Sequence, residues 1–269
     1  MKFILLLIGV CTVVSCRQSP DQVQEEEIID NNVIVHEEYL GEAPVEPEGT
    51  EYYEPIPLRV EPYAQNGTPA DAIVLFDGTS LDAWINSADS TAADWHLNKN
   101  GTMTVKDQNG DIETKQHFGS VQLHIEWKSP EEVRRDGQNR ANSGVFLSGI
   151  YEVQVLDNND NDTYVNGQVG SIYKQHVPLA MASVPSGDWN TYDIIYHAPE
   201  FNDKGQKIES GTLTVIHNGV LIQDHIEIKG TTEYIGWPKN PSHGKGPLKL
   251  QDHRDDSRVS YRNIWIREL

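Results

Sequence analysis

The chain has 269 residues, with 41 acidic and 21 basic side chains and a formal net charge of −20. Residues 17–70 contribute about half of that charge, because they hold 13 acidic residues and two basic ones. Residues 71–269 also carry more acidic than basic side chains, and an acidic surface repels the phosphates of DNA and RNA. The composition therefore argues against a nucleic-acid-binding protein.

The first 16 residues, MKFILLLIGVCTVVSC, predict export. The apolar run at 3–14 is shorter than the roughly 20 residues that a membrane-spanning helix needs, and it fits a secretory signal. The end of the segment, VVSC, resembles a bacterial lipobox, so we predict that Cys16 is lipidated and holds the chain on the cell envelope, at the periplasmic or outer membrane surface. The alternative is a plain signal peptide that happens to contain a cysteine.

Cys11 and Cys16 are both in this segment, and no other cysteine follows. A body released from the segment would have neither a disulfide nor a catalytic thiol, so packing alone must stabilise its fold.

Residues 17–70 are predicted to be a disordered acidic tether. They contain seven prolines and no clear hydrophobic periodicity, so they cannot bury much apolar surface. A transient strand in EEEIIDNNVIV is the alternative.

From residue 71 to residue 269 the sequence predicts one all-β domain. Short alternating runs are separated by turn residues, and Asn218-Gly219 between two apolar runs is typical of a tight type I′ hairpin. About ten strands in roughly 200 residues favour a single β-sandwich or jelly roll. The predicted strands are 121–128, 144–148, 151–156, 191–197, 213–217, 220–228, 248–252 and 261–266. The long charged loop 129–142 is a candidate functional segment.

Polar side chains share one face of several predicted strands. Glu152 and Gln154 alternate with Val153 and Val155, and the same alternation recurs at 121–128 and 248–253. If these strands belong to one curved sheet, the polar side chains converge on its concave face and form the floor of a saccharide site. The predicted floor is His124, Glu126, Glu152, Gln154, Gln251 and His253. The alternative is an ordinary solvated sheet surface.

Other polar and aromatic residues receive simpler interpretations. We expect His217 and His225 to be exposed beside the hairpin turn, and Gln122 and Lys249 to be surface residues. Three tryptophans, Trp84, Trp95 and Trp265, are expected to pack in or against the core, whereas Tyr151, Tyr173 and Trp189 are available to stack on a sugar ring.

Five motifs occur in the order found in one bacterial family: LFDGTSLDAW, LHIEW, NSGVFLSGIYEVQVLD, GDWNTYDIIYHAP and GPLKLQDHRDDSRVSYRNIWIREL. On these motifs residues 71–269 resemble the 3-keto-disaccharide (3-keto-glycoside) hydrolases. The resemblance implies a concanavalin A-like β-sandwich on an exported lipoprotein. It also implies cleavage by removal of the C2 proton, elimination of the C1 substituent and rehydration, on a substrate that a separate sugar oxidoreductase supplies.

The predicted catalytic residues are His253, Glu152, Glu126 and Asp252. His253 is assigned as the base, Asp252 or Glu126 as the group that orients or charges it, and Glu152 as an acid or metal ligand. These four could also hold a divalent cation, a question that the sequence leaves open. The predicted substrate-binding residues are Asn142, Ser143, Gln154, Tyr151, Tyr173, Trp189, Gln251, Arg262 and His124.

Two alternatives bear on these assignments. An ordinary glucanase of this fold needs two carboxylates on one strand, but the strand that carries Glu152 offers an amide at Gln154, which disfavours that mechanism. A surface carbohydrate-binding module without catalytic activity remains the competing hypothesis.

Overall fold

The computed structural model describes residues 42–51, 53–64 and 67–269. The predicted signal segment and Cys16 lie outside the described residues. The chain divides into two compact units at Leu58/Arg59. Within the described part, no helix is long and apolar enough to cross a membrane.

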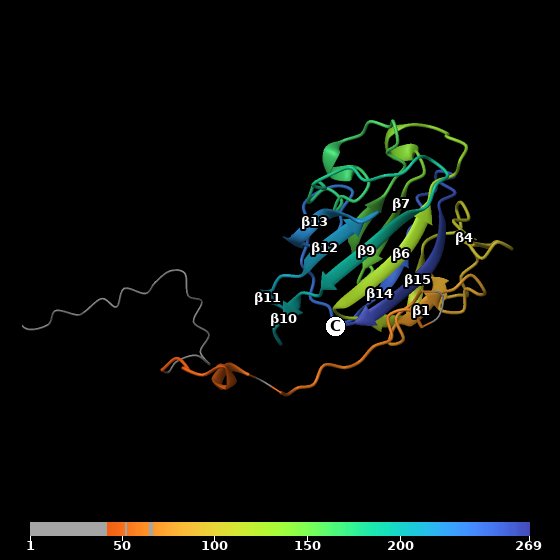
Figure 1. Ribbon diagram of the computed structural model, residues 1–269. Coiled ribbons are helices and arrows are strands. Elements are labelled where there is room, and N and C mark those ends of the chain that lie inside the picture. The colour runs from red at the N-terminus through yellow and green to blue at the C-terminus, as the bar shows by residue number, and fades with distance from the viewer. Residues whose placement is uncertain (1–41, 52, 65–66) are drawn as a thin grey trace, which may run out of the picture. The chain divides into compact units, whose positions relative to one another are not determined.

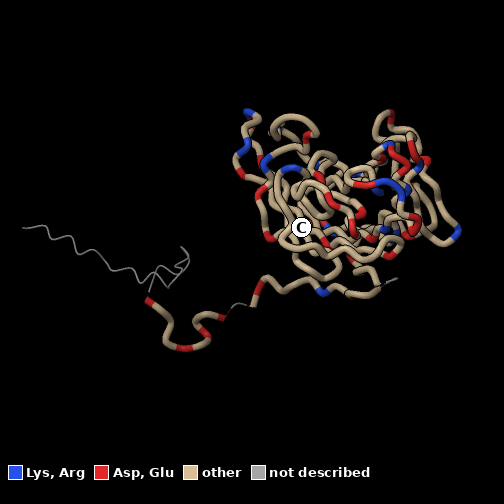
Figure 2. The backbone as a smooth tube through the Cα atoms, turned by 90° about the horizontal axis from the view of Figure 1, so that it is seen from above, with Lys and Arg blue, Asp and Glu red and all other residues tan. Residues whose placement is uncertain are grey.

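The described residues of the first unit, 42–51 and 53–58, are all exposed and contain one short 3₁₀ helix, η2 (Pro47–Thr50). Figure 2 shows acidic positions but no basic ones along this part of the chain. It has no buried residue and therefore no core of its own in the region described.

The second unit is a sandwich of two antiparallel sheets (Figure 1). The larger sheet has the order β13-β12-β9-β6-β15-β4-β3, with β1 paired to β15, and the smaller has the order β2-β5-β14-β7-β8. The larger sheet comprises β1 (Ile73–Phe76), β3 (His96–Leu97), β4 (Met103–Thr104), β6 (Val121–Lys128), β9 (Asn190–His197), β12 (Thr212–His217), β13 (Val220–Glu227) and β15 (Ser260–Glu268). The smaller comprises β2 (Trp84–Asn86), β5 (Ile112–Phe118), β7 (Ser143–Leu147), β8 (Tyr151–Val155) and β14 (Gly246–Leu250).

Short elements complete the unit. A separate hairpin is formed by β10 (Glu200–Phe201) and β11 (Lys207–Glu209), and two 3₁₀ turns, η3 (Gly137–Asn139) and η4 (Val165–Gly167), lie in the loops around β7 and β8. The predicted all-β sandwich is thus confirmed.

The core lies between the two sheets and follows the alternation of the sequence. In β6 the apolar residues Val121, Leu123, Ile125 and Trp127 are buried and the polar residues between them are half-buried. They join a single apolar cluster with Val153 and Val155 of β8. The apolar faces of both sheets therefore point inward, as strands with a period of two residues require.

The hairpin at Asn218-Gly219 forms as predicted, with His217 paired to Val220 and positive φ at both turn residues (51° and 80°). The expectation that His217 is exposed is wrong, however. Its side chain is buried, donates from Nε2 to Asn190 Oδ1 at 2.9 Å, and stacks on Trp127. Burial lowers the pKa of His217 to about 4, so this imidazole is a neutral part of the core.

The expectation of one shared polar sheet is also wrong. Strands β6 and β15, with His124, Glu126 and Arg262, belong to the larger sheet, whereas β7, β8 and β14 belong to the smaller sheet. Since both sheets turn their apolar faces to one core, their polar faces lie on opposite sides of the sandwich. The predicted floor is therefore divided into two separate surfaces.

Candidate active site

A cavity of about 270 Å³ opens on the outer face of the smaller sheet. Its walls come from β7 and β8, from the segment that follows β14, and from loops near residues 173 and 232. The lining residues are Asn142, Phe146, Glu152, Gln154, Tyr173, Thr232, Tyr234, Gln251 and His253. Six of the predicted site residues therefore meet in one place, and we call this space the carboxamide cavity after its three amide side chains.

Glu152 provides the one carboxyl group among the described lining residues of the carboxamide cavity. It is 4% exposed, and Gly144 on the neighbouring strand makes room for it, since a Cβ at Gly144 would lie 2.5 Å from Glu152 Oε1. Burial raises the pKa of Glu152 to about 8, Lys249 acts against this rise, and Asp111 adds to it. This carboxyl group therefore retains its proton at neutral pH and can act as an acid.

Three residues that line the cavity have a buried amide oxygen without a hydrogen-bond partner in the described part of the chain: Asn142 Oδ1, Gln154 Oε1 and Gln251 Oε1. The amide nitrogens of Asn142 and Gln154 are engaged, with Asn142 donating to Gln138 O at 2.7 Å and Gln154 donating to Gly167 O at 3.1 Å. A buried acceptor without a donor costs roughly 1–3 kcal/mol. Three of them in one cavity indicate a ligand that brings hydroxyl groups or a cation.

His253 lines the same cavity and is held by Asp255. His253 Nδ1 lies 2.9 Å from Asp255 Oδ2, so the hydrogen bond leaves Nε2 as the nitrogen available to a ligand. The predicted partner, Asp252, has a different task. Its carboxylate accepts the backbone N–H groups of Gly110 and Arg254, both at 2.9 Å, and it does not line the cavity. Asp252 fixes the loop, and the expected Asp252–His253 pair is corrected to His253–Asp255.

Two predicted substrate-binding residues belong to the core side of the smaller sheet. Ser143 donates to Gln251 O at 2.6 Å and accepts from Tyr261 at 2.7 Å, so its hydroxyl group is fully used. Tyr151 is 1% exposed, packs on Tyr196, and its hydroxyl group lies 2.7 Å from His243 Nε2. Ser143 of β7 and Tyr151 of β8 both point away from the cavity, and neither residue lines it.

Four further predicted residues lie on the outer face of the larger sheet, outside the cavity: His124, Glu126, Arg262 and Trp189. His124 Nδ1 is 2.7 Å from Asp193 Oδ1, and Arg262 Nε donates to Glu126 Oε2 at 2.6 Å. The Arg262 guanidinium lies 4.1 Å from the centre of the Trp189 ring and covers that face. The charged and hydrogen-bonding groups of these residues are paired with one another, which is the pattern of a structural polar cluster.

The charges of the cluster follow from these contacts. Burial alone would lower the pKa of His124, but hydrogen bonds to Asp193 and Glu126 outweigh burial and raise the pKa to about 9. The contact with His124, together with Asn263 and Arg262, lowers the pKa of Glu126 to about 2 despite partial burial. His124 is also stacked on Trp265 at 5.1 Å. Trp265 is buried, and Trp84 and Trp95 belong to the core cluster, as predicted for tryptophans that pack in or against the core.

Sequence reasoning missed the lining residues Phe146, Thr232 and Tyr234, and two residues that act on the site from outside the lining, Lys249 and Asp255. Lys249 lies 4.3 Å above the Phe146 ring and 3.6 Å from Asp111 Oδ2, and its charge acts on Glu152. The expectation of a plain surface residue is therefore wrong, and the signal was available, because Lys249 has the same parity as Gln251 and His253. Asp255 had no such signal, since it lies in an irregular loop.

No group of three or more His, Cys, Asp or Glu side chains able to hold a metal ion occurs among the residues that the structure describes. A cation in the carboxamide cavity would draw on Glu152, His253 and the unpaired amide oxygens. This donor set is mostly neutral oxygen, which hard cations accept.

Comparison with known protein families identifies residues 71–267 as a 3-keto-alpha-glucoside-1,2-lyase-like domain. The chain belongs to this family. The resemblance inferred from the five sequence motifs is thereby confirmed, over nearly the whole of the domain expected at 71–269. A comparison with curated proteins gives no match.

Solved structures agree with the fold. A crystal structure of a "putative glycosyl hydrolase" from Parabacteroides distasonis ATCC 8503 is 52% identical, with a TM-score of 0.80, and the match covers 85% of this chain and 99% of that one. A second from the same organism, described in the same words, is 22% identical with a TM-score of 0.51, over 74% of this chain and 99% of that one. The first supports the family assignment and the second the β-sandwich alone.

Proposed function

We propose that the carboxamide cavity cleaves 3-keto-glycosides by elimination and rehydration. The observation that carries the proposal is the single carboxyl group of the described lining, Glu152, in the same cavity as the imidazole of His253. A two-carboxylate glycosidase needs a second carboxylate in the same cavity. The family name supports a 3-keto-glucoside as the substrate, because a C3 carbonyl acidifies the C2 hydrogen and removes the need for a second carboxylate.

His253 Nε2 removes the C2 proton in the first step. The electrons of the C2–H bond form an enolate whose oxygen is the former C3 carbonyl. The Thr232 hydroxyl group accepts the N–H of Glu152 at 3.0 Å, so its own proton is available to that oxygen. Asp255 keeps the imidazole in the orientation that exposes Nε2.

Departure of the leaving group follows. The enolate re-forms the C3 carbonyl, a C1=C2 double bond appears, and the C1–O bond breaks as Glu152 gives its proton to the departing oxygen. Water then adds to C1, the Glu152 carboxylate takes the proton of that water, and protonated His253 returns a proton to C2. Both residues end as they began. The unpaired oxygens of Asn142, Gln154 and Gln251 accept the sugar hydroxyl groups.

Two further parts of the proposal rest on sequence and chemistry. An enzyme that oxidises the sugar at C3 must act first. Lipidated Cys16 would place the cleavage reaction at the envelope.

The test is to incubate the protein with a 3-keto-disaccharide and with its unoxidised parent in D₂O, with and without chelator. Sugar release from the keto substrate alone, with deuterium at C2 of the product, supports elimination, and loss of activity with chelator would assign a cation. His253→Ala should abolish release and keep binding, whereas His96→Ala, an exposed residue of β3, should change neither. Binding without release in the wild-type protein would refute the proposal and favour a carbohydrate-binding module.

A further inference from the structure

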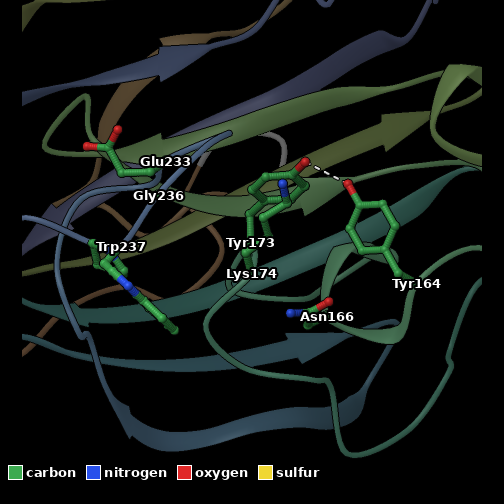
Figure 3. Close-up of a pocket in the computed structure, with 8 residues that line it drawn as sticks. Tyr164, Asn166, Tyr173, Lys174, Glu233, Gly236 and Trp237 are labelled. Atoms are coloured by element: carbon green, nitrogen blue, oxygen red, sulfur yellow. Dashed lines mark hydrogen bonds between the residues drawn. The ribbon is translucent and has the colours of Figure 1, made fainter.

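A second cavity, of about 450 Å³, has an aromatic wall. Figure 3 shows Trp237 and Tyr164 at opposite sides of this space, with Tyr173 and Lys174 between them. We call it the tryptophan cavity. Its lining residues are Tyr164, Asn166, Tyr173, Lys174, Glu233, Gly236, Trp237 and Pro238.

One wall of the tryptophan cavity is fixed in place by its own contacts. The hydroxyl groups of Tyr164 and Tyr173 are 2.6 Å apart. Lys174 Nζ lies 4.6 Å from the centre of the Tyr234 ring and 5.3 Å from that of Tyr173. A cation held over aromatic faces ties the segments that carry these rings together. The aromatic wall therefore exists before any ligand arrives.

The opposite wall exposes apolar surface. Trp237 is 88% exposed, and its loop neighbours Tyr234 and Ile235 are 75% and 82% exposed. Large apolar side chains gathered in this way on a soluble domain mark a binding surface more often than isolated ones do. An indole offers a flat face, which stacks on planar rings and on the apolar face of a pyranose.

The two cavities adjoin. Tyr173 lines both of them, and one loop places Thr232 and Tyr234 in the carboxamide cavity and Glu233 and Trp237 in the tryptophan cavity. The carboxamide cavity, at about 270 Å³, lies just below the range of roughly 300–1,000 Å³ that is typical of ligand pockets. It suits one sugar ring, and the remainder of a larger substrate needs space next to it.

We propose that the tryptophan cavity binds the leaving group of the substrate, and selects leaving groups that present a flat apolar ring face to Trp237. This inference rests on the proposed function, because it assigns the keto sugar to the carboxamide cavity. An aryl group and a second pyranose both have this shape, and the experiment separates them.

The experiment compares three 3-keto-glucosides, with methyl, phenyl and glucosyl leaving groups, on the wild-type protein and Trp237→Ala. We expect kcat/KM to fall about 10-fold for at least one ring-bearing substrate and to change less than twofold for the methyl glycoside, as the loss of one stacking contact implies. Trp237→Phe should restore most of the loss, and Tyr63→Ala, at another exposed aromatic residue, should cause none.

The pattern of loss identifies the ring: loss for phenyl alone assigns an aryl group, and loss for glucosyl assigns a sugar. An equal fall for all three substrates, or no fall for either ring-bearing one, overturns the proposal. If the wild-type protein cleaves none of them, the proposed function has failed and binding decides the subsite. The unoxidised phenyl glucoside and disaccharide should then quench tryptophan fluorescence in the wild-type protein and not in Trp237→Phe, and equal quenching in both would refute the subsite.

Discussion

Replacing Glu152 by Gln tests the central claim about the site, that a buried carboxyl group keeps its proton near neutral pH. Burial raises the pKa of Glu152 from its ordinary value of 4.5 to about 8. Between these two pH values the folded protein holds a proton that the unfolded chain has released. The free energy of unfolding must therefore fall as the pH rises through this window, since stability decreases wherever the folded state binds more protons.

The size of the effect follows from the separation of the two pKa values. At roughly 1.4 kcal/mol per pH unit, the interval corresponds to on the order of 5 kcal/mol of unfolding free energy, all of it lost above about pH 8. Gln has the shape of protonated Glu and carries no charge at any pH. We therefore expect Glu152→Gln to match the wild-type protein at pH 5 and to exceed its stability by several kcal/mol at pH 9.

The assay is urea unfolding of both proteins at pH 5, 7 and 9. The difference between their free energies of unfolding removes the contribution of every group that titrates alike in both proteins. Glu209→Gln, an exposed carboxylate in β11, is the control and should give a difference that is constant with pH. A constant difference for Glu152→Gln as well would refute the assigned environment. Glu152→Gln should also lower turnover of a 3-keto-disaccharide about 100-fold. The loss should be smaller for a 3-keto-glycoside with a nitrophenyl leaving group, because that group departs without an acid.

Three other changes have expected outcomes. Asp255→Asn should lower turnover about 100-fold and change the pH profile of turnover, without changing the unfolding midpoint. Asp252→Asn should instead lower the free energy of unfolding by about 1–3 kcal/mol, because its carboxylate loses backbone contacts. Equal shifts in the unfolding temperature of the two variants would contradict this division of roles. His124→Gln should keep full turnover. Below pH 6.5 it should be about 3 kcal/mol less stable than the wild-type protein, and this difference should vanish as the pH rises past 9. Lost turnover, or a stability difference that is constant with pH, would contradict the structural role of His124. Cys16→Ala should move the protein from the membrane fraction to the soluble fraction, and unchanged partition would exclude the lipid anchor.

Much of the fold was predictable because its signals are local. The alternation at 121–128 and 151–155 gave the strands and their inward faces, and Asn218-Gly219 gave a hairpin with the expected turn. The alternation of residues did not assign the two faces of strand β15, and the reason is local. Asn263 has a positive φ of 47° and the register shifts between Arg262 and Trp265, so a bulge reverses the alternation there.

The sheet to which each strand belongs was not predictable in the same way. Parity assigns a residue to a face of its own strand, and the alternation of β6 and of β8 would look the same in either sheet. The pairing of β6 with β9 and β15 joins segments more than 60 residues apart, and no feature within a strand specifies it. His124 and Glu126 were therefore grouped with Glu152, although they lie on the opposite side of the sandwich.

The two polar faces show which surface is the site. On the larger sheet, outer residues such as His124, Glu126 and Arg262 remain half-buried and pair with one another. On the smaller sheet, loops fold over β8, so that all five of its residues are buried on both faces. Gln154 donates to Gly167 O in one of those loops, yet its oxygen stays without a partner there. The same alternation thus gives two different outer faces. On the larger sheet the polar side chains bond to one another, whereas on the smaller sheet acceptors without a partner lie near a protonated carboxyl group. Only the smaller sheet therefore has groups whose hydrogen bonds a substrate can complete.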